Sequence, residues 1–165
     1  MIIFGKRNYD LNYWKRNGAY AVIRNDHQQF LCVEDLDGNL FLVGGGVEGE
    51  ESPELALLRE SIEETGHEIQ IVEFIGKAER HWVSAKYPYD SQHNIGILYV
   101  CELLEKIAEP VEKETMRWVD FNYLEKHLFH EHHLYLIKQY LNQFHNSSFS
   151  KAQTGPTSKL TFLNL

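Results

Sequence analysis

Short apolar runs that end at turn-forming residues predict several β-strands in the first part of the chain. Asn25-Asp26 separates the first two runs and Asp37-Gly38 precedes the third, and such dipeptides favour tight turns between strands. The runs are GAYAVIR at 18–24, QFLCVE at 29–34 and the short segment at 40–43. We therefore expect three consecutive strands.

A helix with well-defined ends is predicted after the glycines at 44–46. Ser52 can cap its N-terminus, Pro53 suits the first helical position, and Gly66 is a typical stop. On a helical wheel, three apolar residues share one face and three glutamates point to the opposite side. They are Leu55, Leu58 and Ile62 on the first face and Glu60, Glu63 and Glu64 on the second. One side should pack and the other should bind.

The rest of the chain combines further β-segments with a helical region. The polar and aromatic residues at 81–93 are interpreted as a loop on the substrate side. Apolar and polar positions mix at helical spacing over 121–144. The β-segments are expected at 68–75, 95–103 and 115–119. Strands with intervening helices predict an α/β fold.

Length and composition indicate one folded domain. The 165 residues include 43% hydrophobic residues, enough to fill a substantial core. We assign residues 1–145 to a single domain and residues 146–165 to a polar C-terminal tail, because chain ends usually lack packing partners. A short docking strand at the end of that tail is the alternative.

The charge and the lengths of the apolar runs limit the partners. A formal net charge of −8 should repel long nucleic acids and anionic membranes, so a polyanionic substrate would need a bridging cation. No run approaches about 18 apolar residues, and the N-terminus does not resemble a signal peptide. Cys32 and Cys101 lie in strand-like apolar runs, which favours buried reduced thiols. These features predict a soluble cytoplasmic protein.

The three glutamates of the predicted helix indicate a divalent metal. Like charges this close repel one another, and a cation would remove that cost. Carboxylate oxygens favour Mg²⁺, with Mn²⁺ as the alternative, and Mg²⁺ is typically shared with substrate phosphates. Such an ion can orient a pyrophosphate and acidify a bound water, while a spare carboxylate accepts the proton. The simpler interpretation is an amphipathic helix with a solvated acidic side.

Residues near the glutamates suggest a bracing pair and a backbone ligand. Arg59 could form a bidentate pair with Glu51, which would fix the preceding loop to the helix. A peptide carbonyl in the run 44–46 could serve as a neutral metal ligand. These glycines are not a Walker loop, because no Gly-Lys-Ser/Thr follows them.

The full spacing resembles the Nudix box. That pattern is Gly, five residues, Glu, seven residues, Arg-Glu, an aliphatic residue, any residue, Glu-Glu, any residue, Gly and another aliphatic residue. The specified letters are all present, at Gly45, Glu51, Arg59, Glu60, Glu63, Glu64 and Gly66. Ser61 and His67 replace the two aliphatic residues, and Val43 stands where a Pro often precedes the glycines. The order of elements over about residues 15–143 is also similar to that of a Nudix domain.

The resemblance implies an α/β/α sandwich around a mixed β-sheet and a hydrolase that cleaves the pyrophosphate linkage of a nucleoside di- or triphosphate derivative. Carried over by position, the metal ligands would be Glu60, Glu63, Glu64 and the Gly44 carbonyl. Arg59 and Glu51 would brace the site. The general base would be Glu60 or a loop acid outside the box.

The substrate stays open at this level. A MutT-like nucleoside triphosphate pyrophosphohydrolase is the first interpretation, and ADP-sugars, dinucleoside polyphosphates and capped or triphosphorylated RNA are alternatives, with long RNA disfavoured by the acidity. A nucleotide-binding sensor without useful turnover is the competing class. In either case the partner is a small nucleotide, and a homodimer would be unsurprising.

Side chains outside the box supply candidates for substrate binding. Trp82, Tyr87 and Tyr89 could stack on a nucleobase or pack at the rim of the site. His81 and Asn94 could read base edges.

Two other groups receive a structural interpretation. Glu112 and Glu114 are expected to be solvated rather than metal-bound. The histidines within 127–133 do not follow the spacing of known zinc motifs, so we expect a polar helix face there.

Overall fold

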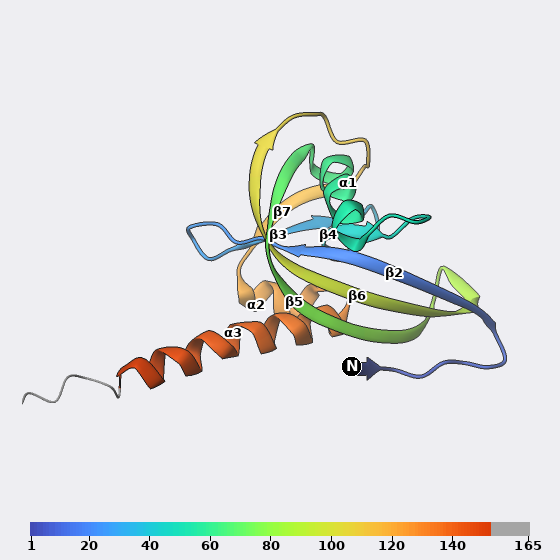
Figure 1. The fold of residues 1–165 in the computed structure, drawn as a ribbon. Helices are drawn as coiled ribbons and strands as arrows, with labels where there is room; N and C mark the ends of the chain where they lie inside the picture. The colour runs from blue at the N-terminus through green and yellow to red at the C-terminus, as the bar shows by residue number, and fades with distance from the viewer. Residues whose placement is uncertain (153–165) are drawn as a thin grey trace, which may run out of the picture.

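The computed structural model describes the backbone of residues 1–152 and the side chains of residues 1–143. Within this range Figure 1 shows a sheet with helices on two sides. In chain order the elements are β1 (Ile2–Phe4), β2 (Asn12–Val22), β3 (Phe30–Glu34), β4 (Leu40–Gly46), α1 (Pro53–Thr65), β5 (His67–Ser84), β6 (Tyr87–Lys106), β7 (Thr115–Val119), α2 (Phe121–His127) and α3 (Glu131–Ala152). The strands predicted at 18–24, 29–34, 40–43 and 115–119 correspond to β2, β3, β4 and β7.

The strands form one mixed sheet in the order β1-β5-β6-β2-β4-β3-β7. β1 pairs with β5 and β2 pairs with β6 in parallel, and the other neighbours are antiparallel. The parallel pairing of β2 with β6 extends over the whole length of β2. This pairing joins the N-terminal strands to the long hairpin formed by β5 and β6.

Helices cover both faces of the sheet. Successive residues of a strand point to opposite faces, and along β2 Ala19 and Ala21 belong to one buried cluster while Tyr20 and Val22 belong to another. Leu57 of α1 packs in the first cluster. Leu124 of α2 and Ile137 of α3 pack in the second. The predicted α/β/α sandwich around a mixed sheet is therefore confirmed.

The ends of α1 are formed as the sequence predicts. The Ser52 hydroxyl accepts a hydrogen bond from the Leu55 N–H at 3.2 Å, and Pro53 is the first helical residue. Gly66 ends the helix with φ of 75°, in the left-handed region that favours glycine. These ends fix where the helix lies in the sequence.

The predicted packing face of α1 is wrong. Leu55 and Leu58 are 58% and 37% exposed, while Ala56 and Leu57 are fully buried. The buried face also includes Glu60, Ser61, Glu64 and Thr65. A helical wheel that treats glutamates as surface residues therefore predicts the wrong orientation of α1 against the sheet. Small Ala56 and Ser61 face the sheet, and two acidic side chains are buried with them.

The loop predicted at 81–93 is also wrong, because these residues form the end of the β5–β6 hairpin. Paired residues continue from His81↔His93 through Trp82↔Gln92 to Val83↔Ser91. Polar and aromatic side chains occur here on both faces, since His81 and Trp82 face different cavities. The sequence therefore lacks the alternation that usually reveals a strand.

The C-terminal helical region differs from its prediction at two points. It divides into α2 and α3, and α3 continues past residue 144 to Ala152, into the predicted tail. Asp120 caps α2 by accepting the Tyr123 N–H at 2.8 Å. Residues 153–165 of the predicted tail lie outside the described part. Among the helices described, none is long and apolar enough to cross a membrane. Cys32 and Cys101 are free and buried, as predicted.

Candidate functional site

Glycines at the end of β4 let a glutamate of α1 lie directly against the sheet. A Cβ atom placed on Gly45 would lie 2.5 Å from the carboxyl carbon of Glu60. One on Gly44, whose φ is 129°, would lie 2.2 Å from the Ala19 carbonyl oxygen. Gly45 thus provides space for an acidic side chain, and Gly44 provides a backbone conformation that L-residues rarely adopt.

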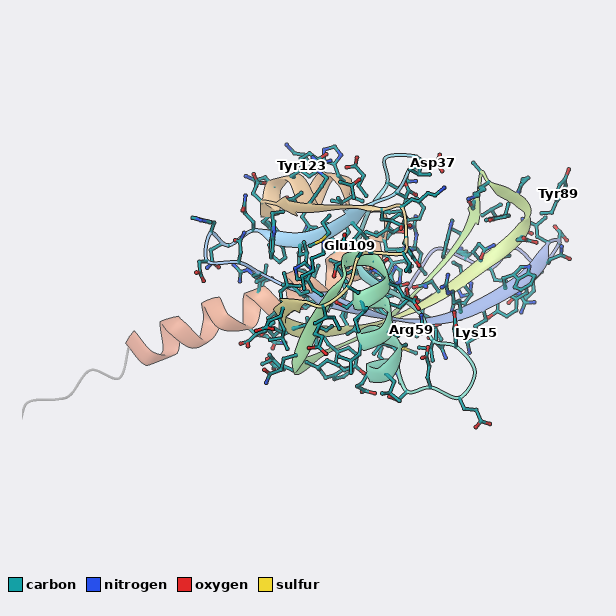
Figure 2. All side chains as sticks on the ribbon, turned by 90° about the horizontal axis from the view of Figure 1, so that it is seen from above. Lys15, Asp37, Arg59, Tyr89, Glu109 and Tyr123 are labelled. Carbon is teal, nitrogen blue, oxygen red and sulfur yellow. The ribbon has the colours of Figure 1, made fainter. Side chains whose placement is uncertain are left out.

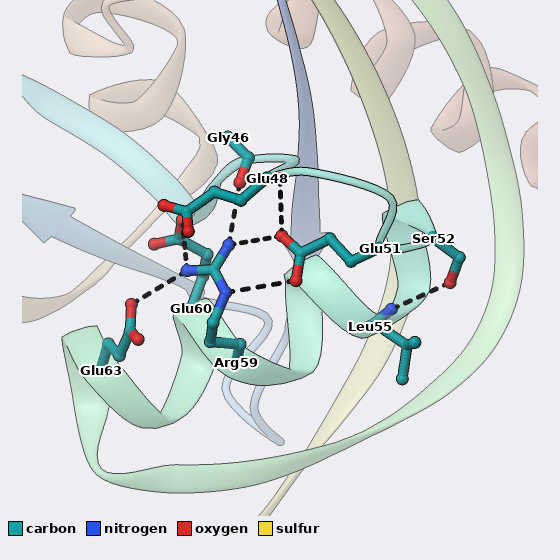
Figure 3. A network of polar contacts seen from close by, with 8 residues as sticks. All are labelled: Gly46, Glu48, Glu51, Ser52, Leu55, Arg59, Glu60 and Glu63. Carbon is teal, nitrogen blue, oxygen red and sulfur yellow. Dashed lines mark hydrogen bonds and ion pairs between the residues drawn. The ribbon is translucent and has the colours of Figure 1, made fainter.

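Arg59 joins the loop before α1 to the acidic side of the helix (Figure 3). Its Nη2 donates to Glu51 Oε1 at 2.7 Å and its Nε donates to Glu51 Oε2 at 3.3 Å, which is the bidentate contact expected from the sequence. Nη2 also donates to the Gly46 carbonyl at 2.9 Å. Nη1 contacts carboxylate oxygens of Glu60 and Glu63, each at 3.0 Å. This one guanidinium therefore orients three carboxylates, and its hydrogen bonds lower the pKa of Glu51.

The carboxylate of Glu112 reaches the site from the segment between β6 and β7. Oxygens of Glu60, Glu63 and Glu112 all lie within 4.8 Å of one another. The N–H groups of Val111 and Glu112 donate to the Glu63 carbonyl at 2.9 Å and 3.2 Å, which holds this segment across the end of α1. Glu112 is exposed, as expected for a solvated side chain, but it also lies in this carboxylate cluster, which its distance from the box along the chain could not indicate.

The expectation of a solvated Glu114 is wrong, because one of its oxygens is buried without a hydrogen-bond partner. Burial and the neighbouring Glu114 raise the pKa of Glu112 to about 7. Burial also raises the pKa of Glu60, although Arg59 acts against that shift. The protein thus holds several carboxyl groups where negative charge is unfavourable.

Glu64 lies deeper than the other acids of the box. Its Oε2 accepts the Gly44 N–H at 2.8 Å, and burial raises its pKa to about 9. Glu64 and Gly44 line the same cavity as Glu60, Glu63 and Glu112. Clustered carboxylates that cannot easily ionise together fit a hard divalent cation such as Mg²⁺, which binds oxygen ligands.

Two cavities that share lining residues lie at and beside this acidic cluster. The first, of about 380 Å³, contains the glutamates. The second, of about 620 Å³, is lined by Trp82, Tyr87 and Asn94 together with Phe41 and Phe129. The two cavities share the residues Arg16, Tyr20, Phe41 and His130. A ligand could therefore place a charged end near the acids and a planar end among aromatic rings.

The predicted substrate-binding residues are only partly brought together. Trp82 and Tyr87 line the larger cavity, whereas Tyr89 is 76% exposed and lies near the end of the hairpin (Figure 2). His81 faces a different cavity. Sequence reasoning missed Phe41 and Phe129, which no motif marks.

The histidines after α2 are buried rather than forming the expected polar helix face. His130, His132 and His133 are all at most 7% exposed, and their rings lie against one another. His133 also packs on Tyr20, with ring centroids 4.2 Å apart. His132 Nε2 lies 2.9 Å from Asn94 Oδ1, and Asn94 Nδ2 donates to the Tyr20 hydroxyl at 3.3 Å. His130 therefore lines the larger cavity, while His132 and His133 support its wall through Asn94 and Tyr20.

Comparison with known proteins identifies the family of this chain. Residues 14–140 match the NUDIX domain family. The chain belongs to this family. It is 33% identical over 105 residues to a putative 8-oxo-dGTP diphosphatase of Bacillus subtilis (strain 168), across 62% of this chain and 64% of that relative. The match thus spans less than two thirds of the relative.

Solved structures share the fold. A NUDIX hydrolase from Nitrosomonas europaea aligns with a TM-score of 0.64 at 19% identity, covering 79% of this chain and 90% of that one. A MutT NUDIX hydrolase from Burkholderia pseudomallei aligns with a TM-score of 0.59 at 24% identity, covering 74% and 96%. At these identities the similarity supports the fold rather than a substrate.

Proposed function

We propose that this NUDIX protein is a Mg²⁺-dependent hydrolase that cleaves the pyrophosphate linkage of a nucleoside di- or triphosphate derivative. The observation that carries the proposal is the convergence of Glu60, Glu63 and Glu112 within 4.8 Å, beside a cavity with aromatic walls. An acidic cavity of this kind would repel a phosphate chain unless a cation lay between them. Mn²⁺ could replace Mg²⁺, since both favour oxygen ligands.

The carboxylates of Glu60, Glu63 and Glu112 would hold the ion. Glu64 and the Gly44 carbonyl are further candidates, and Glu64 Oε1 does not take part in its hydrogen bond to Gly44. When bound, Mg²⁺ supplies positive charge to the pyrophosphate and lowers the pKa of a bound water.

The protein side chains would orient the substrate and move the proton. Arg59 fixes Glu51, Glu60 and Glu63 relative to one another through its hydrogen bonds. Burial and the neighbouring Glu114 raise the pKa of Glu112 to about 7 in the metal-free protein, and a Glu112 oxygen that does not bind the ion could accept a proton from water, as a general base does. Glu60 is the alternative base. Arg16 lines both cavities and can contact the phosphates.

The substrate class follows from the two cavities together. Trp82 and Tyr87 offer rings on which a nucleobase can stack. A nucleoside triphosphate, as in a MutT-like pyrophosphohydrolase, is our first assignment, and the name of the Bacillus subtilis relative supports testing 8-oxo-dGTP. ADP-sugars and dinucleoside polyphosphates are alternatives. The free buried thiols suit a reducing compartment such as the cytoplasm.

A panel of nucleotides tests the assignment. The purified chain is incubated with Mg²⁺ and 8-oxo-dGTP, dGTP, an ADP-sugar or a dinucleoside polyphosphate, and products are identified by phosphorus NMR. Glu63→Gln should abolish turnover, whereas Glu68→Gln, at an exposed position on β5, should not. If Glu63→Gln cleaved every substrate as fast as wild type, the assignment would be wrong. Tight binding without cleavage by wild type would instead indicate a sensor.

Glu112→Gln tests the proposed general base. Loss of a positioned base should lower kcat about 10²- to 10⁴-fold and should remove the acidic limb of the pH–rate profile. The matched control is Glu109→Gln in the same segment, where the exposed carboxylate pairs with Lys106. An unchanged kcat and pH profile in Glu112→Gln would exclude Glu112 as the base.

A further inference from the structure

A second cluster of potential ligands lies on the β5–β6 hairpin, outside the acidic cavity. Glu79 and His81 are two residues apart on β5, so they point to the same face. His93 on β6 pairs directly with His81 across the hairpin. One ligand atom from each of Glu79, His81 and His93 lies within 4.8 Å of those of the other two. Paired strands therefore hold two imidazoles and one carboxylate close together.

The hydrogen bonds orient His93 and leave His81 free to bind. His93 Nε2 lies 2.6 Å from Glu79 Oε2, and its Nδ1 lies 2.5 Å from the Tyr13 hydroxyl. The His81 ring stacks on His93 with centroids 3.9 Å apart, and its Nδ1 is buried without a hydrogen-bond partner. A neutral imidazole is the form that ligates a metal.

We propose that Glu79, His81 and His93 bind a divalent transition metal, and that Zn²⁺ is the ion that fits best. Two histidines and one carboxylate are a known ligand set for zinc, whereas Mg²⁺ prefers oxygen ligands. Tyr13 would not bind the metal itself. Its hydroxyl contacts Nδ1 of His93, the nitrogen not used for the metal, and so fixes the orientation of that ring.

Little movement is needed to admit the ion. Two ligand atoms about 2 Å from a tetrahedral zinc lie roughly 3.3 Å apart. His93 Nε2 and Glu79 Oε2, now 2.6 Å apart, would separate by less than about 1 Å, and the His81 ring would turn its nitrogen toward them.

The fourth position of such a site opens to a cavity beside the N-terminal segment. This cavity, of about 500 Å³, is lined by His81, His93, Tyr13 and the cationic Lys6 and Arg7. Water or a small anion can complete the coordination there. Arg7 lies over the Tyr13 ring, 3.8 Å from its centroid, so a positive charge lies next to Tyr13. An anion as the fourth ligand would balance these cations.

Zinc binding is measured on the full chain after removal of metals with a chelator. A coloured zinc chelator competes with the protein in the presence of excess Mg²⁺, and Co²⁺ reports the ligands by its visible absorption. We expect one zinc per chain with a Kd below about 10 µM. His81→Gln and His93→Gln should each weaken binding by at least about 100-fold and remove the Co²⁺ bands. Tyr13→Phe should weaken it by about 10- to 100-fold.

Two controls separate this site from the rest of the protein. Glu63→Gln alters the acidic cavity and should keep zinc binding, as should His27→Gln at an exposed position. The folding of each variant is compared with that of wild type by circular dichroism and by thermal melting without metal. If a histidine variant does not fold, the zinc affinity of Tyr13→Phe tests the proposal in its place. The proposal is overturned if wild type takes up no zinc, if the hairpin variants bind as wild type does, or if Glu63→Gln loses the zinc.

Discussion

Gly45 allows the carboxylate of Glu60 to lie against β4. Its φ is not in the left-handed region, so the requirement here is space. Gly45→Ala should displace Glu60, because the added Cβ would lie 2.5 Å from the carboxyl group. The far end of a glutamate can move, so the fold should survive while kcat falls about 10²-fold, as expected for a misplacement near 1 Å. Kinetics and thermal melting of the same preparation measure both effects.

A matched glycine provides the control. Gly76→Ala would place a Cβ 3.2 Å from the flexible end of Leu136, and neither residue lines the acidic cavity. It should change kcat little. If Gly45→Ala retained full activity, then the contact between Gly45 and Glu60 would not matter for the site.

At the scale of the element, α1 buries a face that its apolar residues do not mark. Leu57 is fully buried, whereas Leu55, two residues earlier, is 58% exposed. Leu57→Ala should lower the free energy of unfolding by about 2–5 kcal/mol, because it removes apolar contacts and leaves a cavity. Leu55→Ala should change it by less than about 0.5 kcal/mol. Urea unfolding of both variants makes the comparison, and equal losses would contradict the observed orientation of α1.

The same helix shows how far the sequence can predict the structure. Its ends depend on Ser52, Pro53 and Gly66, which act locally, so the sequence locates them. Its orientation depends on Glu60 and Glu64, which are buried against the glycines of β4, the strand that precedes the helix. The contact of Arg59 with Glu51 followed from spacing. Helical periodicity could not show that acidic residues face inward.

Residues outside the box were harder to place because their positions depend on long-range pairing. The pairing of the hairpin strands places Trp82 at a cavity, whereas Tyr89, near the end of the hairpin, is exposed. Glu112 reaches the site through backbone hydrogen bonds to Glu63. Neither kind of contact has a local signature in one sequence.

At the scale of the whole molecule, three buried histidines make stability depend on pH. Burial lowers the pKa of His130 to about 2 and of His132 to about 3, and it lowers that of His133 well below the usual value. Each ring is therefore neutral in the folded protein at pH values where it would be charged in the unfolded chain. The positively charged Arg80 lies close to His130 and acts in the same direction.

The sign of the effect follows from proton binding. Between about pH 6.5 and pH 3 the unfolded chain binds protons at these histidines and the folded protein does not, so the free energy of unfolding falls as the pH falls. Each histidine contributes at most about 1.4 kcal/mol per pH unit in that window. Buried Glu64 acts oppositely in metal-free protein, because its raised pKa favours folding as the pH falls from about 9 toward 4.5.

Because the histidines and Glu64 have opposite effects on the pH dependence of stability, a histidine variant compared with wild type measures the histidine contribution better than wild type alone. Urea unfolding of His132→Gln and wild type is measured at several pH values from 7 to 4, and the difference in unfolding free energy is plotted against pH. That difference should shift in favour of His132→Gln as the pH falls below about 6.5, because only wild type must keep this imidazole neutral to stay folded. The exposed His27→Gln should show no such trend. If the difference for His132→Gln were constant with pH, then His132 would be protonated equally in the folded and unfolded states.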